Sequence, residues 1–257
     1  RRVSLAYAAE VRARGGSIVT GAAVRSIHAR GGRRILETAR GAIEAQAVIT
    51  CAGLHSDRVA AMTGRSGPAD GTAPRIVPFR GDYYTLTPGA RHLVRGLLYP
   101  VPDPRFPFLG VHFTRRIDGE VWAGPNAVLA FAREGYRRRD VSPRDLAETL
   151  AYPGFLRLAR RYLRTGIAEM WRDVSQPAFV AELRRFIPEI GAADLRSGPS
   201  GVRAQALNRD GSLADDFVLD EGDGVLHVRN APSPAATSSL AIGRVLAETA
   251  IQRFGLA

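Results

Sequence analysis

The sequence contains no lysine: all 36 of its basic residues are arginine, and with 25 acidic residues they give a formal net charge of +11. The arginines are spread along the chain and form only short clusters, at 137–139 and 160–161. No zinc-finger spacing, RNA-binding signature or basic patch interleaved with aromatic residues accompanies them. Charge alone supports only non-specific attraction, so we expect no nucleic-acid partner. The net positive charge is also compatible with binding to an anionic membrane surface or to an acidic substrate.

Cysteine is almost as scarce, since Cys51 is the single copy. One cysteine excludes an internal disulfide framework and is compatible with a reducing compartment. No apolar run is long enough to cross a bilayer, and no signal peptide is visible. We therefore expect a cytoplasmic protein, with peripheral contact at the inner membrane face as an option.

Several catalytic motifs are missing as well. The five histidines show no His-x-x-x-His spacing, and Cys-x-x-Cys is absent, which argues against a metal site. The sequence also lacks the G-x-S-x-G elbow of hydrolases and the phosphate-binding loop of nucleotide triphosphatases. Metal-dependent and hydrolytic functions are therefore disfavoured.

What is present indicates a mixed α/β (α+β) fold with ample core, because 45% of the 257 residues are hydrophobic. Residues 1–16 have helical spacing and end at two glycines. Residues 17–53 contain short strands, the last of which, "AVITCAG", is continuously apolar and leads into a helix. That pattern is typical of a parallel sheet covered on both faces.

The middle of the chain predicts a second architecture. Residues 64–78 are rich in glycine and proline, as at a crossing between domains. Residues 79–125 read as antiparallel strands with an Asp118-Gly119 hairpin. Residues 142–187 read as helices that begin at Ser142-Pro143. Strands then return, and residues 235–254 predict a final helix.

Three polar residues on predicted strands are candidates for chemistry. Arg80 and Arg203 could each grip a carboxylate through a bidentate guanidinium. His112 could take a proton near neutral pH. Tyr83, Tyr84 and Asn126 are second choices for hydrogen bonding a substrate. The alternatives stay open: surface ion pairs for the arginines and a hydrogen-bonded core histidine for His112.

The stretch "NAPSPAATSSLAIG", residues 230–243, gives the final helix an unusually small-residue entrance. A helix N-terminus presents unpaired N–H groups and the positive end of the dipole, which suits a ligand with partial negative charge. The other interpretation is an ordinary helix start, with Ser233 as N-cap and Pro234 at the first helical position.

Taken together, "ITCAGLHSDR", "VPFRGDYY", "GPNAVLAFAREGYRRRD", "GPSGVRAQAL" and "NAPSPAATSSLAIG" resemble the FAD-dependent oxidoreductases of the D-amino-acid-oxidase-like fold. The likeness covers nearly the whole chain and is strongest to members that oxidise L-2-hydroxyglutarate. Two elements of that family are missing: the strand–GxGxxG–helix unit that holds the FAD pyrophosphate, and the histidine-containing loop near the flavin that follows it. The likeness therefore implies a truncated form, with an incomplete FAD-binding Rossmann-like domain and an antiparallel-sheet substrate domain with helices.

The resemblance implies a domain division and a set of cofactor contacts. Residues 1–63 and 199–257 would belong to the FAD-binding domain, and residues 64–198 to the substrate domain. Small residues and backbone amides would contact FAD at Val24, Thr50, Cys51, Ala52, Gly53, Gly201, Val202, Pro234, Ala235, Ala236 and Thr237.

The implied reaction is the oxidation of L-2-hydroxyglutarate, or a similar 2-hydroxy acid, to the 2-oxo acid. Arg203 and Arg80 would grip the two carboxylates. Either His112 or the histidine of the missing amino-terminal loop would act as base. The electron acceptor would be a quinone or oxygen. Two alternatives remain: a flavoenzyme resembling glycine, sarcosine or D-amino-acid oxidases, and a non-catalytic fragment unable to hold FAD.

Overall fold

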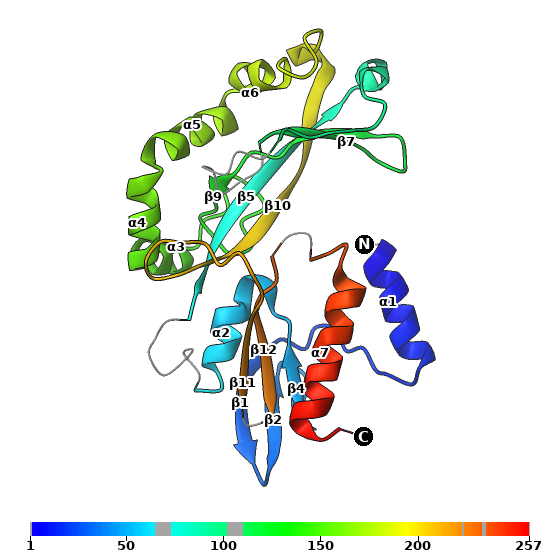
Figure 1. Cartoon of the computed structure of the whole chain (residues 1–257), viewed down its shortest axis with the longest axis vertical. Coiled ribbons are helices and arrows are strands. Elements are labelled where there is room, and N and C mark those ends of the chain that lie inside the picture. Colours follow the sequence, from blue (N-terminus) through cyan, green and yellow to red (C-terminus); the bar gives the residue numbers. More distant parts are fainter. Residues whose placement is uncertain (1, 65–72, 102–109, 223, 233–234, 257) are drawn as a thin grey trace.

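The computed structural model describes residues 2–64, 73–101, 110–222, 224–232 and 235–256. Within these ranges the chain forms two lobes (Figure 1). One contains a six-stranded sheet with helices along one side, and the other contains two three-stranded sheets and helices. The mixed fold class expected from the sequence is confirmed. Among the described residues, no helix combines the length and the apolar character that a membrane crossing requires.

The smaller-sheet lobe begins with α1 (Arg2–Ala13). Gly15 adopts φ 82° and the N–H of Gly16 donates to the Val11 carbonyl at 2.9 Å, which closes the helix where the glycine pair predicted it. An antiparallel sheet follows, made of β1 (Val24–Arg30), β2 (Arg33–Thr38) and β3 (Gly41–Ala45).

The second small sheet has the order β11–β12–β4, with β4 at Val48–Thr50, β11 at Val218–Gly222 and β12 at Val225–Asn230. β4 and β12 pair in parallel, whereas β11 and β12 are antiparallel. The predicted parallel sheet is thus present as a single pair. Its covering on both faces is not confirmed, because Ile49 is 43% exposed. η1 (Gly53–His55) and α2 (Ser56–Ala61) follow β4 directly.

The six-stranded sheet has the order β10–β5–β8–β7–β6, and β9 also pairs with β5. Its strands are β5 (Arg75–Leu86), β6 (Leu97–Leu98), β7 (His112–Arg115), β8 (Val121–Gly124), β9 (Val128–Leu129) and β10 (Leu195–Leu207), with η2 (Pro88–Leu93) after β5. The Asp118-Gly119 hairpin is confirmed: Gly119 has φ 82°, and the N–H of Arg116 donates to the Glu120 carbonyl at 2.8 Å.

Helices line the outer side of this sheet (Figure 1). They are α3 (Pro143–Leu150), α4 (Pro153–Arg161), α5 (Leu163–Val174) and α6 (Gln176–Leu183), followed by η3 (Ala192–Asp194). As predicted, Ser142 caps α3, since its side chain accepts the N–H of Asp145 at 3.3 Å. Phe113 of the sheet and Phe179 and Leu183 of α6 are fully buried in the core between these layers.

Two predicted boundaries differ from the structure. β10 pairs with β5 on both sides of an irregularity between Ser197 and Ser200, so the expected division at residue 199 falls inside a strand of the six-stranded sheet. α7 occupies Ser239–Phe254 rather than 235–254, with Ser238 at the N-cap. The later start has a local cause: the N–H of Ala235 donates to the Pro232 carbonyl at 2.9 Å, which makes a turn before the helix. The expected cap at Ser233-Pro234 lies outside the described residues.

The two lobes are joined by a charged contact that we call the interlobe clasp: Asp57 and Arg58 of α2, with Arg133, Asp145 and Glu148 of the other lobe. Arg133 pairs with both oxygens of Asp57, and Arg58 bonds Asp145 and, at 2.6 Å, Glu148. Burial alone would raise the pKa of Asp57, but the hydrogen bonds and charge of Arg133 outweigh it and lower that pKa.

Candidate active site

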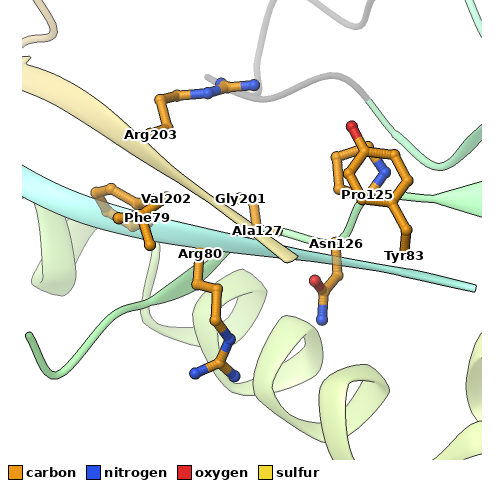
Figure 2. A pocket seen from close by; sticks show the side chains of 10 residues that line it. Phe79, Arg80, Tyr83, Pro125, Asn126, Ala127, Gly201, Val202 and Arg203 are labelled. Atoms are coloured by element: carbon orange, nitrogen blue, oxygen red, sulfur yellow. The ribbon is translucent and has the colours of Figure 1, made fainter. Parts of the chain in front are cut away.

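The middle of the six-stranded sheet presents two chemically different sides, since alternate residues of a strand point in opposite directions. In Figure 2, Arg80 and Asn126 point toward a helix on one side of β5, whereas Arg203 and Tyr83 point to the other. The register agrees, because Arg203 pairs with Phe79 and not with Arg80. We call these the helix side and the open side.

On the helix side, Arg80 is held by two carboxylates. Its Nε lies 3.1 Å from Asp82 Oδ1 and its Nη2 lies 3.0 Å from Asp173 Oδ2 on α5. Asn126 donates to Asp173 Oδ1 at 2.6 Å and accepts the Asp82 N–H at 2.7 Å. Arg138 adds a 3.1 Å contact with Asp173. The side chains of Arg80 and Asp173 are only 5% and 7% exposed, so this is a buried, interlocked network.

The two carboxylates of this network titrate differently. Burial raises the pKa of Asp173, and the nearby Asp82 carboxylate raises it further. Burial also opposes ionisation of Asp82, but hydrogen bonds with Asp173 and Ser200 and the charges of the neighbouring arginines outweigh it, so its pKa is lowered. Asp82 therefore carries the negative charge more readily, and Asp173 keeps its proton to a higher pH.

These contacts change the interpretation of three predicted substrate-binding residues. Arg80 and Asn126 border the hollow described below, but their polar groups turn toward α5 and bind the network. Tyr84 packs its ring against Phe179, with centroids 4.8 Å apart, at the core of the lobe. The two-arginine grip is not supported, because Arg80 and Arg203 lie on opposite sides of the sheet. The ion-pair alternative considered for Arg80 is the one observed, although the pair is buried.

The open side brings together residues from four strands and a loop. Tyr83 packs beside Trp122, with ring centroids 5.4 Å apart, and His112 stacks on Tyr99 at 4.2 Å. The charge of Arg203 acts on both Tyr83 and His112. Next to them lies a hollow of about 220 Å³, lined by Phe79, Arg80, Gly81, Tyr83, Pro125, Asn126, Ala127, Gly201, Val202 and Arg203.

The environment of His112 suits a proton acceptor. Partial burial lowers its pKa below 6.5, the charge of Arg203 lowers it further, and a backbone hydrogen bond opposes the change. Nδ1 lies 3.3 Å from the Gly110 carbonyl and donates to it in the neutral ring, which leaves Nε2 with the free lone pair. Desolvation raises the pKa of Tyr83 and the neighbouring Tyr99 raises it further, so this hydroxyl stays protonated and can donate.

Two glycines form the floor between these side chains. Gly201 of β10 pairs with Gly81 of β5. Among the described residues, a Cβ on Gly201 would meet no atom within 4 Å, whereas a Cβ on Gly81 would lie 2.7 Å from Pro125 Cβ. The strand surface at Gly201 is therefore open to a flat ligand, and Gly81 is small because Pro125 covers it.

The predicted cofactor residues that follow β4 and β12 leave the same edge of this parallel strand pair. β4 and β12 run in parallel, and the last residue of β4, Thr50, pairs with His227, three residues before the end of β12 at Asn230. The turn after Thr50 and the segment after Asn230 therefore both leave the carboxyl edge of this pair. η1, which starts at Gly53, packs against β5 and β10. This places the Gly53 turn beside the strand that carries Arg203, at the junction of the two lobes (Figure 1).

The predicted cofactor-binding residues differ in their exposure and in their hydrogen bonds. Thr50 is buried, and its hydroxyl bonds His227 Nδ1 at 2.8 Å, so its side chain points inward. Cys51 is exposed, Ala52 and Val24 are half-buried, and Gly53 adopts φ 50° with open space around it. Residues 235–237 form the turn before α7, and Pro234 lies outside the described residues. In the described ranges, no group of His, Cys, Asp and Glu could hold a metal ion.

Comparison with known proteins decides the family. A family model described as FAD dependent oxidoreductase matches residues 1–249. The chain belongs to this FAD-dependent oxidoreductase family. The predicted resemblance is thereby confirmed at the level of the family.

Similar proteins include the mitochondrial L-2-hydroxyglutarate dehydrogenases of Nematostella vectensis (51% identity; 99% of this chain and 59% of that protein) and Homo sapiens (48%; 100% and 58%). The L-2-hydroxyglutarate dehydrogenase of Indibacter alkaliphilus is 47% identical (96% and 61%). The chain thus spans about three fifths of the length of these curated relatives.

Solved structures of similar fold include FAD-bound L-alpha-glycerophosphate oxidase of Mycoplasma pneumoniae (TM-score 0.63, 15% identity, 92% of this chain and 52% of that chain). Glycine oxidase of Geobacillus kaustophilus has a TM-score of 0.54 at 17% identity, over 97% and 53% of the two chains. These likenesses support the fold of the two lobes.

The residues of this chain fit FAD in part. Open space over Gly201 and Gly53 leaves room for a flat ring system and for close approach to the backbone. The edge of the β4–β12 pair supplies the small residues that such an approach needs. The 257 residues contain no G-x-G-x-x-G motif, the loop that cradles a dinucleotide pyrophosphate at a helix N-terminus.

Proposed function

We propose that this chain carries the substrate-binding side of an FAD-dependent enzyme that oxidises L-2-hydroxyglutarate to 2-oxoglutarate. The observation that carries the proposal is the open side of the six-stranded sheet, where Arg203 and Tyr83 line the hollow over the glycine floor and the charge of Arg203 reaches His112. Family membership and the names of the similar proteins support it.

In this proposal the chain's own residues perform three tasks. Arg203 binds a substrate carboxylate through its planar guanidinium. Tyr83 donates a hydrogen bond that orients the substrate. His112 accepts the proton of the 2-hydroxyl group at Nε2, because its lowered pKa keeps the ring neutral near pH 7. When bound, FAD supplies the hydride acceptor for carbon 2.

In this proposal FAD contacts Cys51, Ala52 and Gly53 after β4, Ala235, Ala236 and Thr237 before α7, Val24 at the start of β1, and Gly201 and Val202 of β10. Thr50 belongs to the edge of the β4–β12 pair through its backbone, since its hydroxyl is engaged by His227. The negative charge that develops on a flavin during hydride transfer would be stabilised by backbone N–H groups near the start of α7.

We further propose an external electron acceptor, a quinone or oxygen, and a cytoplasmic enzyme with peripheral membrane contact. The relatives cited from animals are named mitochondrial, and the bacterial one is not. Cell fractionation with the soluble and membrane fractions assayed separately tests this location.

The deciding experiment uses the purified chain with added FAD under anaerobic conditions. We expect flavin absorbance to remain after desalting and to be bleached by L-2-hydroxyglutarate. Sarcosine, glycine and D-2-hydroxyglutarate are the comparison substrates. Bleaching by an amine but not by the hydroxy acid would favour the amine-oxidase alternative. Protein that stays colourless after incubation with FAD would support the non-catalytic alternative and overturn the proposal for this chain.

A further inference from the structure

Helix α5 carries a row of large apolar side chains that nothing in the described part of the chain covers. Leu163, Ile167, Met170, Trp171 and Val174 are each between 51% and 63% exposed. Their spacing of four, three, one and three residues places them on one side of the helix. We call these five residues the α5 stripe.

The opposite side of α5 fixes the direction in which the stripe points. Asp173 is buried and bonds Arg80 of the sheet, and Arg172 pairs with Glu169 and, at 3.6 Å, with Glu182 of α6. Because these residues tie α5 to the lobe, the stripe points outward, away from the sheet. Figure 1 shows α5 at the outer edge of this lobe.

The charge in the segment that leads into the stripe is basic. Between Glu148 and Glu169 the sequence contains no acidic residue but has four arginines, at positions 157, 160, 161 and 164, all of them exposed. Exposed apolar residues with a tryptophan, next to a cluster of arginines, are the composition of helices that lie on anionic membranes.

We propose that the α5 stripe and these four arginines dock on the surface of an anionic lipid bilayer, with α5 lying in the plane of the interface. The arginines favour lipid over a second copy of the chain, since a contact between two copies through this surface would bring both arginine clusters together. A bilayer with acidic headgroups instead neutralises them. This surface gives a place to the peripheral membrane contact proposed above and rests on that part of the proposed function. None of its residues lies on the open side, so it stands or fails separately from the proposed reaction.

Vesicle co-sedimentation of the full chain tests this surface. The probes are phosphatidylcholine vesicles with and without phosphatidylglycerol. We expect binding to the anionic vesicles only, weakening with added salt. The double variant Ile167→Glu/Trp171→Glu should reduce partitioning more than tenfold. Replacing one arginine of the cluster by glutamine should reduce it about fivefold.

A matched control is Val245→Glu/Ile251→Glu, which alters two apolar residues of similar exposure on α7. It should bind as the unaltered chain does, and circular dichroism should show that each variant is folded. Absence of binding to anionic vesicles, or equal loss in both double variants, would overturn the proposal. So would a dimer in sedimentation velocity that the α5 variant converts to monomer, because the stripe would then join two copies.

Discussion

The two sides of the six-stranded sheet use the same residue types for opposite purposes. On the helix side, Arg80 is 5% exposed and bound to Asp82 and Asp173. On the open side, Arg203 is exposed beside Tyr83 and His112. One arginine holds α5 to the sheet, and the other faces a space large enough for a ligand. The network thus fixes β5 on the helix side, and the open side of the sheet can present side chains to a substrate.

The largest expected effect is on stability, and it comes from disrupting the buried Arg80–Asp173 network on the helix side. Asp173→Ala removes one of the two carboxylates that bind the buried Arg80 side chain. It also removes the oxygen that accepts the hydrogen bond from Asn126. We expect the free energy of unfolding to fall by about 3–5 kcal/mol. Urea denaturation monitored by circular dichroism measures it. Asp215→Ala, which removes an exposed carboxylate, should change the value by less than about 0.5 kcal/mol. Equal losses in the two variants would contradict a buried network.

Breaking the open side should instead reduce activity and leave stability nearly intact. Arg203→Met removes the proposed carboxylate contact, so kcat/KM for L-2-hydroxyglutarate should fall on the order of 10²- to 10³-fold. Steady-state kinetics with FAD and an artificial acceptor measures this. Arg196→Met alters an exposed arginine of the same strand and serves as control. If the two variants were equally active, Arg203 would have no role in substrate binding.

Gly81 and Gly201, which pair across β5 and β10, allow covered and open strand surface to be compared at one register position. Gly81→Ala places a methyl group against Pro125, so we expect a loss of about 1–3 kcal/mol in unfolding free energy. Gly201→Ala meets open space, so its stability should stay within about 0.5 kcal/mol of the unaltered chain. Thermal and urea unfolding of both variants measures the contrast. A larger loss for Gly201→Ala would mean that the floor is covered.

The smallest expected effect is electrostatic. Desolvation and the charge of Arg203 both lower the pKa of His112, so it should titrate below 6.5. Arg203→Met removes the second cause and leaves the first, so the pKa of His112 should rise toward the ordinary value. NMR titration of the imidazole C–H signals, assigned with His112→Gln, measures both values. An unchanged pKa would place the two side chains farther apart than described.

Local patterns predicted much of the fold. The double glycine after α1, the Asp118-Gly119 hairpin and the Ser142-Pro143 start of α3 depend on neighbouring residues, and all three are confirmed. The start of α7 was predicted four residues too early. The composition of residues 230–243 permits both a helix and a turn, and the hydrogen bond from Ala235 to Pro232 selects the turn.

The site was predictable only where the residue type itself indicated chemistry. Arg203, Tyr83 and His112 were proposed from the sequence and lie on one side of the sheet, and their roles stay predictions. Arg80 could not be interpreted correctly, because its partner Asp173 is 93 residues away on a helix. No local pattern connects the two. Tyr99 and Trp122, which complete the open side, were missed for the same reason.

The interlobe clasp has a consequence for how the molecule denatures. Arg133 is 6% exposed at its side chain, and it bonds Asp57 and the Leu54 carbonyl across the junction. Separating the lobes would break the contact of Arg133 with Asp57 and those of Arg58 with Asp145 and Glu148 together, so we expect the two lobes to unfold as one unit. Calorimetry should accordingly record a single heat-absorption peak whose van't Hoff and calorimetric enthalpies agree.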